Sequence, residues 1–238
     1  SDFLCPYCGD QAPVLDGVQA AHAADVRLIY RHLPLPMHAG ADLAAEAAVE
    51  AGRQGKFWPF HDQVFAASRG GLSRAVLLER GALAGLDVAA LAAALDDHRH
   101  KDAVLADAAA ALSLGANATP TLFVNGQALP GMVKADELEA VVAAELERAR
   151  SLIARGVAPG DVYGVIGLGA EHTELGDPRQ LARAGLGIEP GAVERVRMVV
   201  AACRAGDGAD ARRLAARLRD AAAALVRGVC ADRGIDLP

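Results

Sequence analysis

The sequence predicts an α/β fold with a helical insertion, followed by a small all-helical appendage. Three observations support this prediction. Residues 26–32 alternate and are β-branched, as expected of a strand. Residues 121–124 and 127–129 have a strand-like pattern as well, with Asn125-Gly126 as a tight hairpin turn between them. Helical periodicity fills most of the remaining chain, up to a Gly- and Pro-rich segment at 167–191 that we expect to be irregular.

The composition is consistent with one full domain and a small second one. The chain has 238 residues, of which 53% are apolar, and a formal net charge of -6. This mildly acidic balance without a basic stretch argues against nucleic acid or an anionic membrane as the main partner. No apolar run approaches the roughly 20 residues that span a bilayer, so no transmembrane segment is predicted.

The first helix is predicted to begin at Pro6, because proline suits the first turn of a helix, where its missing N–H has no partner. Apolar residues recur at helical spacing to about Ala24, and Pro13 is expected to kink this helix. The strand at 26–32 follows, and residues 33–36 end it with two prolines.

The helical insertion is predicted at about residues 39–114. The helices expected in it cover 41–54, 60–67, 73–84 with Ser73 as the N-cap, and one or two more within 88–114. His98 and His100 fall on the last of these helices. Residues two positions apart on a helix are separated by about 200° around its axis, so these two side chains are not expected to bind one metal ion together.

A long amphipathic helix at about 135–155 is expected to close the first domain, residues 1–156. Residues 157–160 resemble a linker, and residues 157–238 form the predicted appendage. Its expected helices are a short one that Asp161 caps, and two amphipathic ones at 192–204 and 210–233.

The segment Cys5-Pro6-Tyr7-Cys8 carries the chemistry. A cysteine at a helix N-terminus meets the positive end of the helix dipole and unpaired N–H groups, which favour its thiolate. Cys5 is therefore predicted to be an exposed nucleophile, and Cys8 the buried thiol that resolves a mixed disulfide. Half of a zinc site is the alternative, but no second C-x-x-C and no nearby Cys/His pair supplies further ligands.

Several stretches together resemble the bacterial DsbA-like proteins of the thioredoxin superfamily. Residues 1–8 are similar to the active-site segment of this family, and Pro13 matches its kinking helix proline. Residues 115–126 look like the second family signature, and residues 56–62 are also family-like. The Cys-Pro-Tyr-Cys sequence occurs in glutaredoxins too, but these lack a large helical insertion.

The resemblance covers about residues 1–155 and implies a thioredoxin-like fold in which the insertion is the helical lid. It also implies a cis peptide bond before Pro120, which would turn the N–H and C=O of Thr119 toward an extended substrate beside Cys5. The residues expected to contact substrate are Pro6, Tyr7, Thr119 and Pro120.

One strand of the family fold is missing from this sequence. In the family a central strand precedes the dithiol helix, whereas here only residues 1–4 precede Cys5. We therefore expect a fragment of a longer chain, from which any signal peptide or anchor has been removed or lies upstream. The family implies the bacterial periplasm or cell envelope as its location.

The function implied by the resemblance is a thiol–disulfide oxidoreductase without a cofactor, which acts on the cysteines of protein substrates through the Cys5–Cys8 dithiol. We expect it to act as an oxidant. A reductase or isomerase that a membrane electron donor supplies is one alternative. A redox-inert binding module, which holds a partner with its groove and helical appendage, is the other.

The remaining cysteines are Cys203 and Cys230. They cannot meet in one unbroken helical hairpin, because the second helix would be a rod of roughly 30 Å. If that helix breaks near Asp220 and reverses, a disulfide becomes feasible and would favour an oxidising compartment. The alternative is two buried free thiols.

Four other polar residues of the first domain could take part in proton transfer. Asp2 is expected to have a loop or capping role rather than to accept a proton from the dithiol. No role is assigned to the histidines, since a lone histidine is more often structural or solvated; these are His32, His38 and His61.

Overall fold

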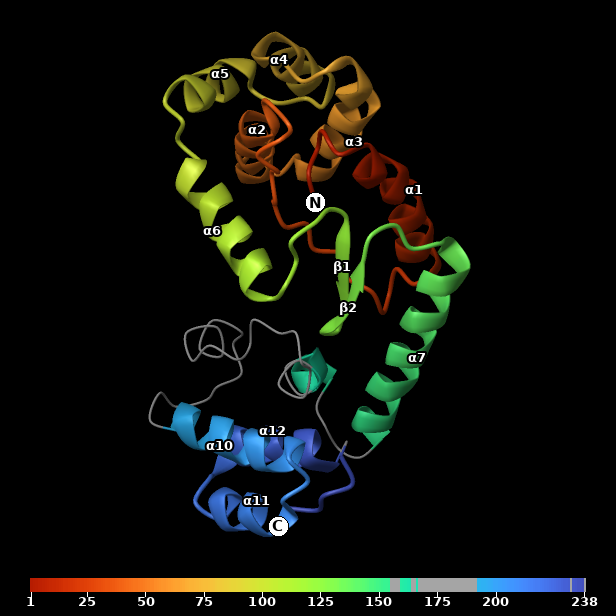
Figure 1. Cartoon of the computed structure of the whole chain (residues 1–238), viewed down its shortest axis with the longest axis vertical. Coiled ribbons are helices and arrows are strands. Elements are labelled where there is room, and N and C mark those ends of the chain that lie inside the picture. Colours follow the sequence, from red (N-terminus) through yellow and green to blue (C-terminus); the bar gives the residue numbers. More distant parts are fainter. Residues whose placement is uncertain (155–158, 164–165, 167–191, 232, 238) are drawn as a thin grey trace. The chain divides into compact units, whose positions relative to one another are not determined.

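The computed structural model describes residues 1–154, 159–163, 166, 192–231 and 233–237 (Figure 1). Its elements are α1 (Pro6–Ala21), α2 (Ala41–Arg53), α3 (Phe57–Ala67), η1 (Ser68–Gly70), α4 (Arg74–Leu83), α5 (Val88–Asp96), α6 (Lys101–Ser113), β1 (Thr121–Val124), β2 (Gln127–Pro130), α7 (Ala135–Ala154), η2 (Pro159–Asp161), α10 (Val193–Arg204), α11 (Gly208–Ala215) and α12 (Asp220–Ala231).

These elements form two compact units. The first comprises Ser1–Leu122 and Leu129–Glu139, and the second comprises Phe123–Ala128 and Ala140–Pro238. The division therefore passes through the hairpin and through α7. The domain boundary predicted at residue 156 lies outside the described residues and stays a prediction.

The helical insertion is built around α2, which packs against α3, α4, α5 and α6 (Figure 1). The buried face of α2 carries alanines at helical spacing, which are Ala44, Ala47, Ala48 and Ala51. Because alanine side chains are short, the neighbouring helices can approach α2 closely and fill the core with larger residues. Those larger residues include Phe60, Leu77 and Leu91, which are completely buried.

Phe3 anchors the start of the chain in the core of this insertion. Its ring stacks on Tyr30 with a centroid distance of 5.2 Å and lies 5.0 Å from the ring of Phe65. Since Phe3 is only two residues before Cys5, the dithiol segment is fixed directly to the insertion.

The strand predicted over residues 26–32 is wrong, because the structure has no strand there. This segment is linked to the chain start by two backbone hydrogen bonds. The N–H of Ser1 donates to the carbonyl of Arg31 at 2.9 Å, and the N–H of Leu33 donates to the carbonyl of Ser1 at 2.8 Å. These bonds follow the pattern of a parallel pair, but they involve a single residue, so no ladder forms.

The predicted helices of the insertion are present, with small changes at their ends. α3 begins three residues before the predicted start, and the Ser73 hydroxyl accepts the N–H of Val76 as the expected cap of α4. The placement of His98 and His100 on a helix is wrong. They lie in the turn between α5 and α6, where His98 has a left-handed φ of 48°.

The hairpin is a two-stranded sheet, as the sequence predicts. Its turn residues Asn125 and Gly126 both have positive φ, at 48° and 87°, which is the geometry of a type I′ turn. The Asn125 side chain also donates a 3.0 Å hydrogen bond to the carboxylate of Glu145 on α7, which fixes the turn within the second unit.

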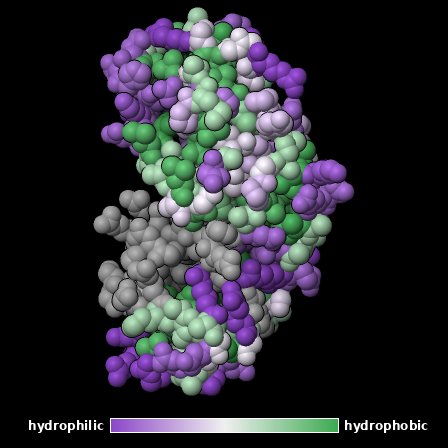
Figure 2. Space-filling view, in the orientation of Figure 1, coloured by the Kyte–Doolittle hydropathy of each residue, from purple (hydrophilic) through white to green (hydrophobic). Residues whose placement is uncertain are grey.

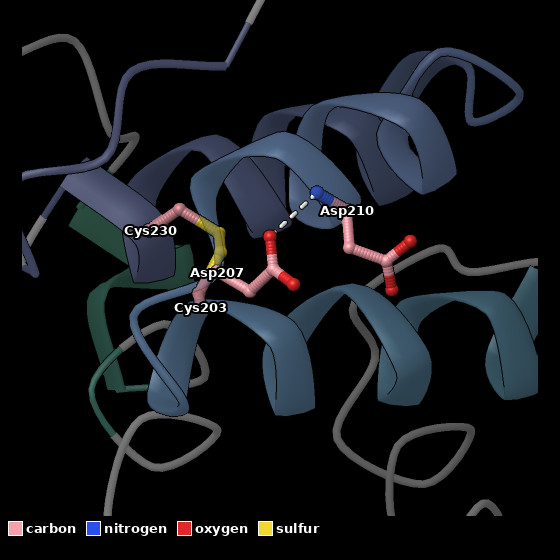
Figure 3. The surroundings of a disulfide bond; sticks show 4 residues. All are labelled: Cys203, Asp207, Asp210 and Cys230. Atoms are coloured by element: carbon pink, nitrogen blue, oxygen red, sulfur yellow. Dashed lines mark hydrogen bonds between the residues drawn. A yellow bond between two sulfur atoms is a disulfide. The ribbon is translucent and has the colours of Figure 1, made fainter.

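The second unit is a small helical bundle of α10, α11 and α12 with its own buried core (Figure 1). The single helix predicted over 210–233 is wrong, because the structure has two helices there, α11 and α12. The chain reverses between them and α12 begins at Asp220, which meets the condition stated for a disulfide. This reversal brings Cys203 and Cys230 together as a disulfide with a Cα–Cα distance of 5.3 Å (Figure 3). Beside it, Asp207 caps α11 by accepting the N–H of Asp210.

No described helix is long and apolar enough to cross a membrane. On the face that Figure 2 shows, hydrophilic and hydrophobic side chains are mixed over the helices of the insertion. Residues 157 and 158 of the predicted linker lie outside the described residues, and residues 159 and 160 begin η2. The predicted irregular segment at 167–191 lies wholly outside the described residues. Of the short helix predicted after Asp161, the described residues 162, 163 and 166 are helical.

Candidate functional site

The dithiol lies at the N-terminus of α1, where Cys5 is the N-cap and Pro6 is the first helical residue. The carbonyl of Cys5 accepts the N–H groups of Cys8 and Gly9 at 3.0 and 3.3 Å, which closes the first turn around the two cysteines. Both cysteines are free thiols in this structure. The local sequence therefore places Cys5 at the end of the helix and Cys8 one turn inside it, as predicted.

The prediction that Cys5 is exposed is wrong, because only 4% of the residue is accessible. Its thiol turns away from solvent and donates a 3.3 Å hydrogen bond to the carbonyl of Thr119. The two residues between the cysteines are exposed instead, and 61% of Tyr7 is accessible.

Thr119 and Pro120 lie beside Cys5, and the peptide bond between them is cis. The carbonyl of Pro120 accepts the N–H of Gly131 at 2.8 Å, which ties this turn to the segment after β2. The hydroxyl of Thr119 is buried beside the dithiol, where it acts to lower the pKa of the Cys8 thiol against the larger effect of burial. Substrate binding by Pro6, Tyr7, Thr119 and Pro120 stays a prediction, but the structure brings Thr119 and Cys5 into direct contact.

Cys8 is buried, with 3% of the residue accessible, and its sulfur accepts the backbone N–H of Asp2 at 3.5 Å. Burial raises the pKa of the Cys8 thiol above its ordinary value, and the hydrogen bonds to the sulfur, including that from Asp2, counteract part of this rise. Cys8 is therefore protonated at neutral pH and must lose its proton before it can attack a mixed disulfide.

The carboxylate of Asp2 is the centre of a buried cluster that the sequence reasoning missed. It accepts the N–H of Leu4 at 2.8 Å, the N–H of Leu35 at 2.8 Å and Nδ1 of His38 at 2.7 Å. Asp2 thus has the loop role that the sequence predicts. The sequence assigns no role to its partner His38. The two residues are 36 positions apart, so no local spacing could have indicated the pair.

His32 is packed into the aromatic cluster around Phe3 and Tyr30, with ring centroid distances of 6.2 and 5.1 Å. Its ring Nδ1 is buried without a hydrogen-bond partner. Burial lowers the pKa of His32 to about 4, although the nearby Asp107 carboxylate acts in the opposite direction. A neutral His32 is thus part of the folded state.

This lowered pKa predicts that the free energy of unfolding falls as the pH drops from about 6.5 to about 4. In that window the unfolded chain binds a proton at His32 and the folded chain does not, which corresponds to a loss of up to about 3 kcal/mol. Urea unfolding at several pH values measures the slope. His32→Phe should flatten it, while His98→Gln, at an exposed histidine, should leave it unchanged; equal slopes in all three proteins would contradict the prediction.

Two further histidines pair with carboxylates of α2. His98 Nδ1 lies 3.0 Å from Glu46, and His100 Nε2 lies 2.6 Å from Glu50. Burial acts to raise the pKa of Glu50, but hydrogen bonds from Gln54 and His100 outweigh it and lower this pKa. These pairs attach the α5–α6 turn to α2. Within the described part of the chain, no three potential ligands gather as a metal ion would require.

A groove of about 410 Å³ lies beside the dithiol, between α1 and α3. Pro6, Gly9 and Pro13 form its α1 side, because small or ring-closed side chains leave this helix face open. Asp10 and Asp62 contribute charge to it. The groove begins next to Cys5 and is large enough for one or two side chains of a bound segment.

Comparisons with known proteins agree with this geometry. A crystal structure described as a thioredoxin-like oxidoreductase from Silicibacter pomeroyi DSS-3 is 30% identical in sequence and superposes with a TM-score of 0.54. The match covers 62% of this chain and 83% of that protein. The fold around the dithiol is therefore that of a solved thioredoxin-like protein.

Curated relatives match a similar share of the chain. A protein named Na(+)/H(+) antiporter NhaA from Herminiimonas arsenicoxydans is 38% identical over 150 residues, and Na(+)/H(+) antiporter NhaA 3 from Salinispora tropica is 36% identical over 151 residues. Each match covers 63% of this chain but only 24% and 23% of the relative. The chain thus spans about a quarter of the length of these relatives.

The family comparison covers the dithiol helix, the insertion, the cis proline and the first part of α7, residues 135–143. The profile of the DSBA-like thioredoxin domain matches residues 1–143, which is more than half of the chain. This range contains every residue of the site described above. The chain therefore belongs to the family of DSBA-like thioredoxin domains.

Proposed function

We propose that this chain is a thiol–disulfide oxidoreductase that acts on cysteines of protein substrates. The observation that carries the proposal is the contact of the Cys5 thiol with the Thr119 carbonyl, directly before the cis proline, at the N-terminus of α1. The helix N-terminus stabilises negative charge on a sulfur at this position. The backbone beside it can pair with an extended polypeptide. No bound cofactor is needed for this chemistry.

In the oxidising direction, the reaction starts from a Cys5–Cys8 disulfide. A substrate thiolate attacks Cys5 Sγ, so that the substrate–Cys5 bond forms and the Cys5–Cys8 bond breaks with Cys8 leaving as a thiolate that takes up a proton. A second substrate thiolate then attacks the substrate sulfur of the mixed disulfide, and Cys5 leaves as a thiolate. The substrate loses two electrons, the dithiol gains them, and an external disulfide or quinone-linked oxidant must restore it.

We propose the oxidising direction because the helix N-terminus favours Cys5 as a leaving thiolate. The exposed Pro6 and Tyr7, together with Thr119 and Pro120, would hold the substrate segment. A location in the periplasm or cell envelope would suit this direction, since thiols are oxidised there, and the disulfide of the second unit is consistent with such a compartment.

A membrane redox partner, which would supply electrons to the dithiol, is the first alternative to the oxidant. It is favoured by the similarity to relatives that are named as antiporters, of which this chain spans about a quarter. A membrane protein that exchanges electrons with the Cys5–Cys8 pair would make the chain a reductase or an isomerase instead of an oxidant. Redox-inert binding of a partner is the remaining alternative.

Redox equilibration with glutathione tests these functions. The purified chain is incubated at defined ratios of reduced to oxidised glutathione, and the Cys5 and Cys8 thiols are counted by alkylation and mass spectrometry. A reduction potential near about −120 mV supports an oxidant, and one near about −270 mV supports a reductase. If the Cys5–Cys8 pair neither equilibrates with glutathione nor exchanges with reduced or oxidised protein substrates, the proposed oxidoreductase function is refuted. The function as a redox-inert binding module would then remain.

A further inference from the structure

We propose that His38 is a positioning residue for the resolving thiol: it orients Asp2, whose backbone N–H then stabilises the sulfur of Cys8. This inference rests on the proposed function, since it concerns the reverse of the first exchange step: the Cys8 thiolate attacks Cys5 Sγ of the mixed disulfide, the Cys5–Cys8 bond forms, and the substrate sulfur leaves as a thiolate. The groups involved come from two segments, the residues before Cys5 and the turn that leads into α2.

The side chain of Asp2 is completely buried, and each of its oxygens is occupied. One oxygen accepts the N–H of Leu4, and the other accepts both the N–H of Leu35 and Nδ1 of His38. A carboxylate has no donor of its own, so a buried one is held in place by the N–H groups that surround it. Because its oxygens face these donors, the carboxylate has no contact with either sulfur.

The backbone of Asp2, in contrast, contacts the dithiol directly. Its N–H donates to Cys8 Sγ at 3.5 Å, and its carbonyl accepts the N–H of Cys5 at 3.2 Å. Any rotation of the Asp2 peptide unit would therefore move the donor away from Cys8. The three side-chain hydrogen bonds oppose this rotation, and the one from His38 is the shortest of them.

His38 is itself held by the turn in which it lies. Its N–H donates to the carbonyl of Leu35 at 2.9 Å, and its carbonyl accepts the N–H of Ala41, the first residue of α2. The ring is partly buried, with 22% of the side chain accessible. The position of the resolving thiol is thereby connected through His38 to the first helix of the insertion.

The expected consequence concerns the thiolate of Cys8. An N–H donor on sulfur favours the thiolate and so opposes the effect of burial on the Cys8 thiol. Loss of the donor would leave a smaller fraction of Cys8 as thiolate and so slow its attack on a mixed disulfide. A hydrogen bond to a charged group has a net value that corresponds to about a tenfold change or more in such a rate. The equilibrium between dithiol and disulfide should change much less, because Cys8 is a protonated thiol in the dithiol.

The test uses the full chain and an aromatic disulfide reagent that releases a coloured thiolate. The first release reports the attack by Cys5, and the second reports the resolution by Cys8. His38→Ala should slow the second release about tenfold, while the first release and the glutathione equilibrium change less than about twofold. His38→Asn should restore the second release to within about threefold, because its amide N–H can replace Nδ1–H as the donor to Asp2.

A matched control is available on the opposite end of α1, where His22 Nε2 lies 2.6 Å from the carboxylate of Glu139. His22→Ala removes a similar pair far along the helix from the dithiol and should change neither release nor the equilibrium. The proposal is overturned if the second release of His38→Ala equals that of the native chain, if both releases slow equally, or if His38→Asn fails to restore the second release. A native chain that gives no second release would instead refute the proposed function.

Discussion

Replacing Cys8 with serine should convert the chain into a trap that holds protein substrates on Cys5 as mixed disulfides. Cys5 keeps its place at the N-terminus of α1, so it can still attack a substrate disulfide. The resolving thiolate is lost, and with it an intramolecular reaction whose effective concentration exceeds that of any external thiol. We expect the mixed disulfide to live at least about 1,000-fold longer than in the native chain.

The measurement is the decay of a mixed disulfide with an oxidised protein substrate, followed on non-reducing gels and by mass spectrometry. Cys5→Ser is the matched control, since it should form no adduct although Cys8 remains present. Adducts on Cys8 in that control, or rapid decay in Cys8→Ser, would contradict the assigned roles.

The parts of the site that could be predicted from sequence are local. Cys5, Pro6 and Cys8 are fixed by a single helical turn, and its geometry follows from the spacing of the cysteines and the proline at the first helical position. The environment of Cys5 could not be predicted in the same way. Its burial results from Thr119, which is 114 residues away in the chain.

The Asp2–His38 pair shows the same limit. Each residue taken alone has several ordinary roles, and only the tertiary fold shows that His38 faces the carboxylate of Asp2. The turn that contains His38 ends at the start of α2, so its position depends on how the insertion packs. A distance of 2.7 Å between two side chains is thus a property of the whole first unit, whereas a helix cap is a property of a few residues.

The fold could be predicted where periodicity determines the structure. α2, α4, the hairpin and α10 lie close to their predicted ranges because each carries a clear apolar pattern or a turn sequence. Residues 26–32 have an equally clear strand pattern, but a strand requires a partner strand, and the backbone that pairs with Arg31 and Leu33 is the single residue Ser1. The turn at His98 was missed because its left-handed residue is a histidine and not a glycine.

Removing the disulfide of the second unit should destabilise that unit by about 3–4 kcal/mol. Cys203 and Cys230 are separated by 27 residues, and closing a loop of this length lowers the entropy of the unfolded chain by a corresponding amount. Both cysteines are also buried in the core of the unit, with accessibilities of 1% and 0%, so the substitution Cys203→Ala with Cys230→Ala keeps the apolar character of the site.

Hydrogen exchange measures this loss separately in the two units of the intact chain. Amides of α10 and α12 should exchange about 100-fold faster or more in the double variant, because they open with the small bundle, while amides of α2 should keep their protection. Reduction of the native chain should reproduce the effect, which distinguishes the covalent link from the loss of two side chains. Unchanged protection of α10 and α12 would mean that Val196, Val199 and Val226, which are completely buried, suffice to hold the bundle without the disulfide.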